Sequence, residues 1–176
     1  MNETLKILKE RRSVRRYEAR PVEREKLDAI LEAGKYAPSA KGQQSVTMVV
    51  LTKREDIAEL SALNAAVMGT SSDPFFGAPC VVVVLADPEA TNAANAQRDG
   101  SLTMGNLMNA AASVGVSSCW INRAEEVFAE PQGKALLRRW GLPERLMGVG
   151  NCILGYAAGE IPAPKPRKAD FVKFVD

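Results

Sequence analysis

Residues 80–86 read Cys-Val-Val-Val-Val-Leu-Ala, and this run of seven apolar residues decides the fold. β-branched residues favour extended strands, and a strand that shows no alternation with polar residues is covered on both of its faces. We therefore expect residues 80–86 to form a strand inside a sheet, with other elements packed against both sides of that sheet.

Outward from this strand, the period of the apolar residues predicts further helices and strands. Helices are expected over residues 2–12, 22–36, 55–67, 95–114 and 134–140. Strands are expected over residues 46–52, 117–122 and 148–156, followed by a short tail strand over residues 171–175. This order of elements indicates the α+β class or a three-layer sandwich. The sequence contains no internal repeat and no linker, so residues 1–176 are expected to form a single domain.

Three groups of apolar residues need partners in such a fold. The first helix can be capped by Asn2, and it is expected to turn toward a core the side chains of Leu5, Ile7 and Leu8. The helix over residues 95–114 is expected to face inward with Leu102, Leu107, Ala110 and Ala111. The C-terminus ends in an apolar group that either a partner subunit or the chain's own body would cover, namely Phe171, Val172, Phe174 and Val175.

The composition is that of an ordinary globular protein, with 46% apolar and 25% charged residues in a chain of 176. No apolar run approaches the roughly 18 residues that indicate a membrane span, and the first residues lack the apolar stretch of a secretory signal. The three cysteines are widely spaced without a C-x-x-C pattern, which is typical of free buried thiols in a reducing compartment. We therefore expect a cytoplasmic protein without a membrane partner.

The sequence contains no histidine. Its absence excludes Ser-His-Asp and Cys-His nucleophilic machinery and removes the commonest ligand of transition metals. We therefore expect no metal site. If the protein is an enzyme, either carboxylates perform the acid–base work or a bound cofactor carries the chemistry. The second of these is the preferred interpretation.

Positive charge is concentrated near the N-terminus, where residues 1–26 hold nine Lys/Arg against five Asp/Glu while the whole chain has a net charge of +2. Residues 11–16 of this part read Arg-Arg-Ser-Val-Arg-Arg. The planar guanidinium group matches phosphate oxygens two at a time, and a serine hydroxyl adds a neutral donor. Basic residues also offset the dipole at the end of a helix, which would account for one or two of the four arginines. The segment indicates an anion site, since a nucleic-acid face would need a more basic domain.

Three further segments carry candidate binding groups. Residues 38–44, Pro-Ser-Ala-Lys-Gly-Gln-Gln, form a loop whose amides can bond a flat heteroaromatic ring, although many helix–strand loops are equally polar. Residues 119–123, Cys-Trp-Ile-Asn-Arg, end a strand where amides often meet ligands, and Trp120 would serve as an aromatic wall or as core. Residues 164–168, Pro-Lys-Pro-Arg-Lys, splay three cations from an extended backbone, as a solvated tail also would.

Taken in order, these segments resemble the FMN-dependent nitroreductase family. The resemblance is carried by the Arg-Arg-Ser-x-Arg cluster after the first helix, Ala37-Pro38-Ser39 with Gln44 soon after, the strand over residues 115–121, and the closing Pro-Lys-x-Arg-Lys. It covers nearly the whole chain. It implies a three-layer α-β-α sandwich around a mostly antiparallel sheet, and an intertwined homodimer with two FMN sites at the subunit interface.

The resemblance also implies roles for particular residues. The group that holds the FMN phosphate and reaches the pyrimidine edge of the flavin would be Arg11, Arg12, Ser13 and Arg15. The loop contributed by the other subunit would be Pro38, Ser39 and Ala40, with Gln44 beside it. The amides near the flavin N5 would be those of Ile121, Asn122 and Arg123. The cations that return to the phosphate from the tail would be Lys165 and Arg167.

The activity implied is transfer of a hydride from NADH or NADPH to FMN and on to a small-molecule electron acceptor, such as a nitroaromatic or a quinone. No catalytic side chain is assigned, because the cofactor carries the chemistry. The sequence contains no G-x-G-x-x-G fingerprint that would bear on the choice between the two nicotinamides. The alternatives are a non-catalytic flavin-binding or regulatory protein on the same fold, and a flavin enzyme of other chemistry, such as dehalogenation. No nucleic-acid partner is expected.

Overall fold

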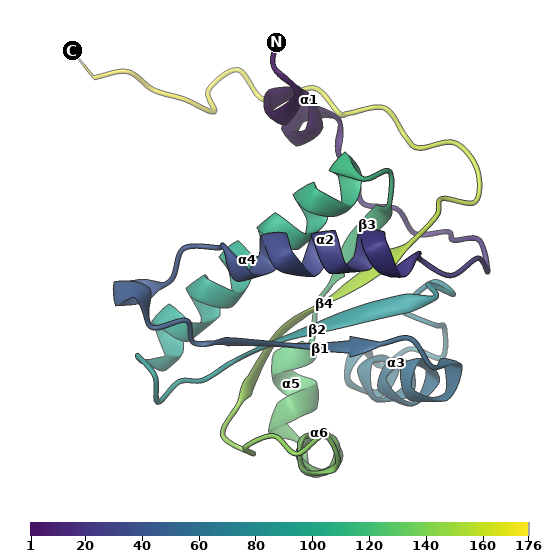
Figure 1. The fold of residues 1–176 in the computed structure, drawn as a ribbon, viewed down its shortest axis with the longest axis vertical. Coiled ribbons are helices and arrows are strands. Elements are labelled where there is room, and N and C mark those ends of the chain that lie inside the picture. Colours follow the sequence, from purple (N-terminus) through teal and green to yellow (C-terminus); the bar gives the residue numbers. More distant parts are fainter. Residues whose placement is uncertain (176) are drawn as a thin grey trace.

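The computed structural model describes residues 1–175, and its centre is a sheet of four strands in the order β1-β2-β4-β3. The strands are β1 (Val46–Leu51), β2 (Cys80–Ala86), β3 (Ser117–Ile121) and β4 (Met147–Gly155). Each neighbouring pair is antiparallel. β2 lies between β1 and β4 (Figure 1) and is buried along its whole length, which confirms the central strand expected over residues 80–86.

Helices cover both faces of this sheet, and their bounds are α1 (Glu3–Glu10), α2 (Arg24–Lys35), α3 (Arg54–Met68), α4 (Ala93–Ser113), α5 (Ala124–Ala129) and α6 (Pro131–Arg139). α2 and α4 pack on the face that carries Val82 and Val84 of β2. The other three sheet-covering helices, α3, α5 and α6, pack on the face that carries Val81 and Val83. Because successive side chains of a strand point to opposite faces, β2 serves two separate cores. The three-layer α-β-α sandwich of the α+β class is confirmed.

The long helix α4 lies very close to the sheet. A Cβ atom added to Gly100 would lie only 2.5 Å from a methyl carbon of Val149 in β4, so this approach requires a glycine. Not every expected contact is made, since Leu102 on the same helix is 47% exposed and the prediction that it faces inward is wrong. Among residues 1–175, no helix combines the length and the apolar character needed to cross a bilayer.

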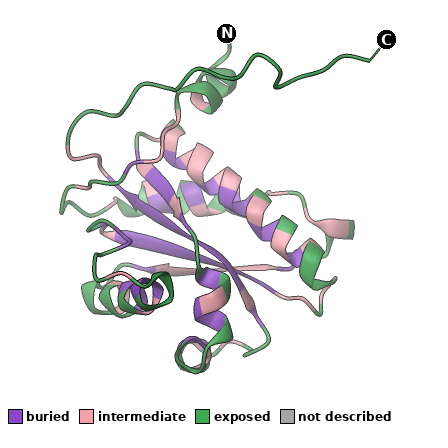
Figure 2. Cartoon of the chain, turned by 180° about the vertical axis from the view of Figure 1, so that it is seen from behind, coloured by how far each residue is buried: buried purple, intermediate pink, exposed green. Residues whose placement is uncertain are grey.

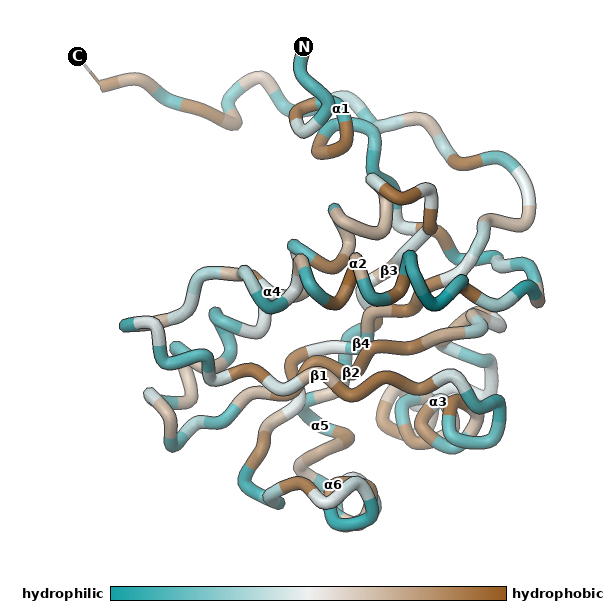
Figure 3. The backbone as a smooth tube through the Cα atoms, in the orientation of Figure 1, coloured by the Kyte–Doolittle hydropathy of each residue, from teal (hydrophilic) through white to brown (hydrophobic). Residues whose placement is uncertain are grey.

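Helix α1 projects from the sandwich. Asn2 caps it as expected, because its side-chain oxygen accepts a hydrogen bond from the amide of Leu5 at 3.0 Å. No residue of α1 is buried, and Leu5 and Leu8 are half exposed. The prediction that this apolar face meets a core is therefore wrong within one chain. Figure 2 shows α1 almost entirely in the colour of exposed residues, and Figure 3 shows apolar segments on it away from the body.

The C-terminal segment also leaves the body. Residues 157–175 contain no helix or strand, so the tail strand expected over residues 171–175 is wrong for a single chain. Its first residues pair with the backbone of Arg16 and Tyr17, and beyond them the segment runs away from the sheet (Figure 1). The apolar side chains at its end are between 68% and 88% exposed, namely Phe171, Val172, Phe174 and Val175. The chain alone leaves this group uncovered.

One helix, α5, was not expected from the sequence. It has six residues and follows Arg123, whose φ of +75° turns the backbone into it. Helices this short are not stable on their own and depend on packing. Here the packing partner is β4, because a Cβ atom on Gly148 would lie 2.2 Å from the carbonyl oxygen of Ala124. The helix therefore exists through a close tertiary contact that no local pattern reveals.

Candidate functional site

The arginine-rich segment, residues 11–16, leaves α1 and crosses the start of the sheet edge formed by β3. The amide of Val14 donates a hydrogen bond to the carbonyl of Ser118 at 3.0 Å, within a parallel bridge between Ser13 and Ser118. The carbonyl of Arg16 accepts one from the amide of Ala158 at 3.0 Å. The backbone of the segment is thus fixed against the sheet, and its side chains are not needed to hold it there.

Beside this segment lies a cavity of about 190 Å³ that contains buried polar atoms without partners. Its lining includes Arg11, Arg12, Ser117, Ser118 and Ile161. Three buried atoms, Nη1 of Arg11, Nε of Arg12 and Oγ of Ser118, have no hydrogen-bond partner. Buried polar groups are normally bonded, and leaving a charged one unpaired is costly. The residues that carry these three atoms line the cavity, and their guanidinium and hydroxyl groups suit an anion with several acceptor oxygens, such as a phosphate.

The remaining side chains of the segment line a second cavity, of about 390 Å³, which Ser13, Arg15 and Arg16 share with residues 157–160. Among the described residues, none of the four arginines in positions 11–16 forms an ion pair. Arg12 alone has a local role, because its Nη1 donates to the carbonyl of Lys9 at 2.8 Å and so helps to end α1. Helix capping therefore accounts for one of the four.

The end of β3 lies farther along the same sheet edge. Ile121 is buried, whereas Asn122 and Arg123 are exposed. The guanidinium of Arg123 donates to Glu126 at 2.7 Å, so this side chain is engaged and only its backbone is available to a ligand. From Ser118 to Asn122 the strand advances about 13 Å at roughly 3.3 Å per residue. The predicted amide donors therefore lie about 13 Å along the strand from Ser118, which bonds the arginine-rich segment in the same chain.

The loop over residues 38–44 is strongly turned and internally bonded. It contains the short helical turn η1 (Ala40–Gly42), and Lys41, Gly42 and Gln44 all have positive φ, at +53°, +67° and +50°. The amide of Gln44 donates to Oγ of Ser39 at 3.0 Å, and the amide of Ala40 donates to Oδ1 of Asp99 at 2.9 Å. Since the Ala40 amide is already used, the donors that this loop can still offer to a ligand include the Ser39 hydroxyl proton and the side chains of Lys41 and Gln44.

The structure does not bring this loop to the arginines within one chain. The loop is bonded to Asp99 near the start of α4, whereas Ala112 near the end of α4 lines the cavity of Arg11. The 13 residues between these two positions span about 20 Å at 1.5 Å per residue. Figure 1 shows the loop between α2 and β1 at the opposite end of α4 from α1.

The two tail cations, Lys165 and Arg167, are exposed in the C-terminal segment. In the described part of the chain, neither makes a hydrogen bond or ion pair with the arginine-rich segment. The tail nevertheless starts at the site, because Ile161 lines the cavity of Arg11 and Arg12. Arg167 follows six residues later, and six extended residues reach about 20 Å. The tail is thus long enough for its cations to fold back onto the cavity.

Comparison with known proteins identifies the fold that carries this arrangement. Residues 8–156 match the nitroreductase family, which leaves only the first residues and the tail outside the match. The chain belongs to the nitroreductase family. The match confirms the family that the sequence indicated through the arginine cluster, the loop and the β3 strand.

Relatives within the family are similar over almost the whole chain. A protein of Archaeoglobus fulgidus, proposed to be an NADH dehydrogenase/NAD(P)H nitroreductase, is 31% identical over 162 residues, covering 91% of this chain and 88% of that protein. The FMN reductase [NAD(P)H] of Bacillus subtilis is 29% identical over 181 residues, covering 95% and 70%. A crystal structure of a nitroreductase with bound FMN from Bacteroides fragilis superposes with a TM-score of 0.91 at 30% identity, covering all of both chains.

Two polar groups of the site were missed by sequence reasoning. Asp99, which bonds the loop, lies 59 residues from Ala40 in the sequence, and no local pattern connects them. Ser118 was noted only as part of a strand. The buried thiols offer no alternative chemistry, because burial raises the pKa of Cys80 to about 12 and also raises that of Cys152. Neither thiol is a nucleophile near neutral pH.

Proposed function

We propose that this member of the nitroreductase family is an FMN-dependent oxidoreductase that uses NADH or NADPH to reduce a small acceptor. The observation that carries the proposal is the set of unpaired buried donors on Arg11, Arg12 and Ser118 in a cavity at the sheet edge. The name of the Bacillus subtilis relative supports NAD(P)H as the hydride donor, and the Bacteroides fragilis nitroreductase, which has bound FMN, supports FMN as the cofactor.

The residues of the arginine-rich segment would hold FMN by its phosphate. Arg11 and Arg12 would direct Nη1 and Nε to phosphate oxygens, with hydroxyls from Ser13 and Ser118 as neutral donors. Lys165 and Arg167 would close over the phosphate when the tail folds back from Ile161. Arg15 would reach the pyrimidine edge of the flavin, and the amides of residues 121–123 would approach N5. The unpaired buried atoms of Arg11, Arg12 and Ser118 support this assignment, as does the start of the tail at the same cavity through Ile161.

A homodimer would complete the site. Since the loop over residues 38–44 lies about 20 Å from the arginine cavity along α4, Pro38, Ser39, Ala40 and Gln44 would meet the FMN held by the partner subunit. Each chain also exposes apolar groups that need cover, namely Leu5, Leu8, Leu102 and the four tail residues between Phe171 and Val175. Burial of such groups is the main favourable term in stable association.

FMN held by these residues would supply the chemistry for hydride transfer between NADH or NADPH and an acceptor such as a nitroaromatic or a quinone. The chain's own residues bind and orient. Arg15 and the amides of residues 121–123 would place positive charge and donors where negative charge collects around the ring. Protons for the acceptor would come from water, so no side chain of this chain is assigned to proton transfer.

Two further assignments accompany this function. We infer one domain over residues 1–176, because both cores are built on the same sheet. We also infer a cytoplasmic location, which is supported by three free, buried cysteines in a chain without a disulfide among residues 1–175.

A visible spectrum of the purified protein tests the function. The protein is expected to be yellow, to release FMN on denaturation, and to lose its flavin absorbance under anaerobic conditions when NADH or NADPH is added. A colourless protein that cannot be reconstituted with FMN would contradict the proposal. Bound flavin that neither nicotinamide bleaches would instead indicate a non-catalytic flavin-binding protein.

A further inference from the structure

The loop over residues 38–45 adopts a conformation that its own sequence does not favour. Lys41 and Gln44 are non-glycine residues in the left-handed region of φ, and Gly42 between them has φ of +67°. Such residues persist only where the surroundings determine the backbone, and they concentrate at ligand-binding sites. Something outside the loop must therefore hold it in this shape.

The group that holds it is the carboxylate of Asp99 on α4. Its Oδ1 accepts the amide hydrogen of Ala40 at 2.9 Å, and its Oδ2 accepts the hydroxyl hydrogen of Ser45 at 2.8 Å. These two residues stand at the two ends of the strained turn. One carboxylate thus fixes both ends of the loop to the same point of the helix.

The side chain of Asp99 is buried and has no cationic partner within residues 1–175, which is unusual for an aspartate. It is only 4% exposed, and it takes part in no ion pair among the described residues. A buried charge is costly unless it is well hydrogen-bonded. Both of its oxygens bond the loop, and a cavity of about 130 Å³ that Asp99 lines also includes Ser39 and Gln44. The carboxylate is therefore committed to the loop and not to a surface ion pair.

We propose that Asp99 is the positioning residue of the second half of the flavin site. It holds the loop so that the Ser39 hydroxyl, whose oxygen already accepts the amide of Gln44 at 3.0 Å, directs its proton to the FMN of the partner subunit. This inference rests on the proposed two-chain FMN site. Asp99 itself does not touch the flavin and acts through Ala40 and Ser45.

The test compares Asp99→Ala, Asp99→Asn and the control Asn92→Ala in the full-length dimer. Asn92 caps the same helix, since its side-chain oxygen accepts a hydrogen bond from the amide of Asn95 at 2.9 Å, and it makes no hydrogen bond to the loop among the described residues. The probe is FMN, titrated into apoprotein and followed by its fluorescence, together with hydrogen–deuterium exchange of residues 39–45 in the apoprotein.

Asp99→Ala is expected to weaken FMN binding about 10- to 100-fold, the range for loss of hydrogen bonds to a charged group. It should also speed amide exchange at Ala40 and Gln44. Asp99→Asn keeps one carbonyl oxygen for the Ala40 amide and should restore most of both properties. Asn92→Ala should lower the melting temperature and change neither of them.

The outcomes separate this inference from the function on which it rests. A wild-type apoprotein that does not bind FMN removes the proposed function and the inference with it. If the wild type binds FMN and a folded Asp99→Ala dimer binds it equally well, or binds it weakly with unchanged exchange in the loop, the inference is overturned while the function stands. Should Asp99→Ala fail to fold, Ser45→Ala removes one of the two bonds, and unchanged FMN affinity and loop exchange would overturn the inference in the same way.

Discussion

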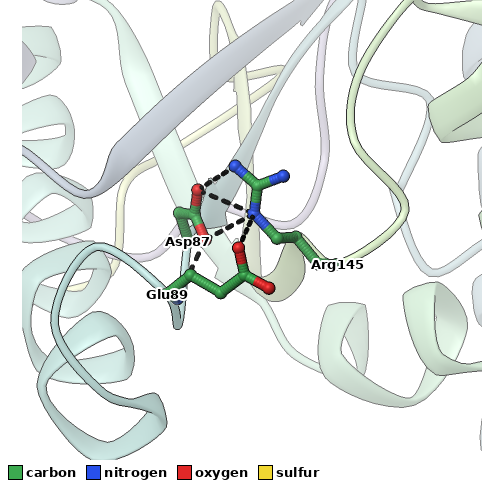
Figure 4. Close-up of polar contacts among 3 residues, drawn as sticks. All are labelled: Asp87, Glu89 and Arg145. Carbon is green, nitrogen blue, oxygen red and sulfur yellow. Dashed lines mark hydrogen bonds and ion pairs between the residues drawn. The ribbon is translucent and has the colours of Figure 1, made fainter.

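The arginines of residues 11–16 differ in their partners from Arg145, which lies with Asp87 and Glu89 in a cluster at the far end of the sheet (Figure 4). In the cluster, Nη2 of Arg145 lies 2.8 Å from Asp87 and its Nε lies 3.0 Å from Glu89. In the arginine-rich segment, no guanidinium meets a carboxylate in the described part of the chain, and two buried nitrogens lack any partner. The guanidinium group of Arg145 is paired with carboxylates, whereas those of the arginine-rich segment are not paired with any in residues 1–175.

The difference separates a structural role from a binding role. Arg145 ties the end of β2 to the segment before β4 through its ion pair with Asp87. The amide of Asp87 donates to the carbonyl of Ser45 at 2.8 Å, which joins the end of β2 to the residue before β1. Arg20, close to the arginine-rich segment, pairs with Glu23 and stacks at 3.6 Å over the ring of Tyr156. A location near the N-terminus therefore does not explain why the arginines at residues 11–16 have no carboxylate partner in the described chain. Donors that the chain leaves unpaired are available to a ligand.

The largest effect is expected from Arg11→Ala. It should weaken FMN binding by about 1–3 kcal/mol, the range for hydrogen bonds to charged groups. Because the removed Nη1 has no partner in the chain, the melting temperature of the apoprotein should not fall. Titration of apoprotein with FMN, beside a thermal melt, measures both. If Arg11→Ala destabilises the apoprotein and leaves the FMN affinity unchanged, Arg11 has a structural role like that of Arg145 and does not bind the phosphate.

Arg167→Ala extends the same comparison to the tail. The loss in FMN affinity should again lie within about 1–3 kcal/mol, and should be smaller than for Arg11, since ordering an exposed tail offsets part of the gain. The same titration checks this result, with Lys173→Ala as the matched tail variant. Equal affinities for wild type and Arg167→Ala would remove the tail from the phosphate site.

Arg145→Ala should show the opposite pattern, with lower stability and intact binding. The ion pairs lie at the surface, where each contributes about 0.2–1 kcal/mol, and 1 kcal/mol corresponds to roughly 2–4 °C in a domain of this size. FMN affinity should equal that of the wild type. A substantial loss of flavin from Arg145→Ala would erase the distinction between the two groups of arginines.

The smallest effect is a dependence on pH. The hydrogen bond from Arg145 holds the pKa of Asp87 below its ordinary value of 3.8. A lowered folded-state pKa gives stability that is fully present above the unfolded-state pKa and is lost as the pH falls through the folded-state pKa. The difference in unfolding free energy between wild type and Arg145→Ala should be constant from neutral pH to about pH 5 and should shrink below about pH 4. Urea denaturation at several pH values measures it, and a difference that grows in acid would contradict the assignment.

The sequence predicts what depends on local pattern. The apolar run over residues 80–86 predicts a strand that contributes alternate side chains to two cores. The patterns over residues 46–52, 117–122 and 148–156 predict the other three strands of the sheet. The apolar face of α1 was also recognised, but the sequence does not say that the chain's own body leaves this face uncovered. The loop over residues 38–44 was predicted, but its attachment to Asp99 was not, because the two bonds join residues more than 50 positions apart. The lack of a partner for Nη1 of Arg11 among the described residues likewise cannot be predicted from the sequence, because it depends on where the carboxylates lie in the folded chain.

The central claim is that each FMN is held by the arginines of one subunit and the loop of the other. It is tested most directly by a mixed dimer, isolated with two affinity tags, in which one chain carries Arg11→Ala and the other carries Ser39→Trp. Each variant is first shown to bind FMN poorly as a homodimer. If sites span two chains, both defects fall in one site, and the mixed dimer keeps one FMN of wild-type affinity. If every site belongs to one chain, the mixed dimer contains no intact site, and the absence of any tightly bound FMN would contradict the account.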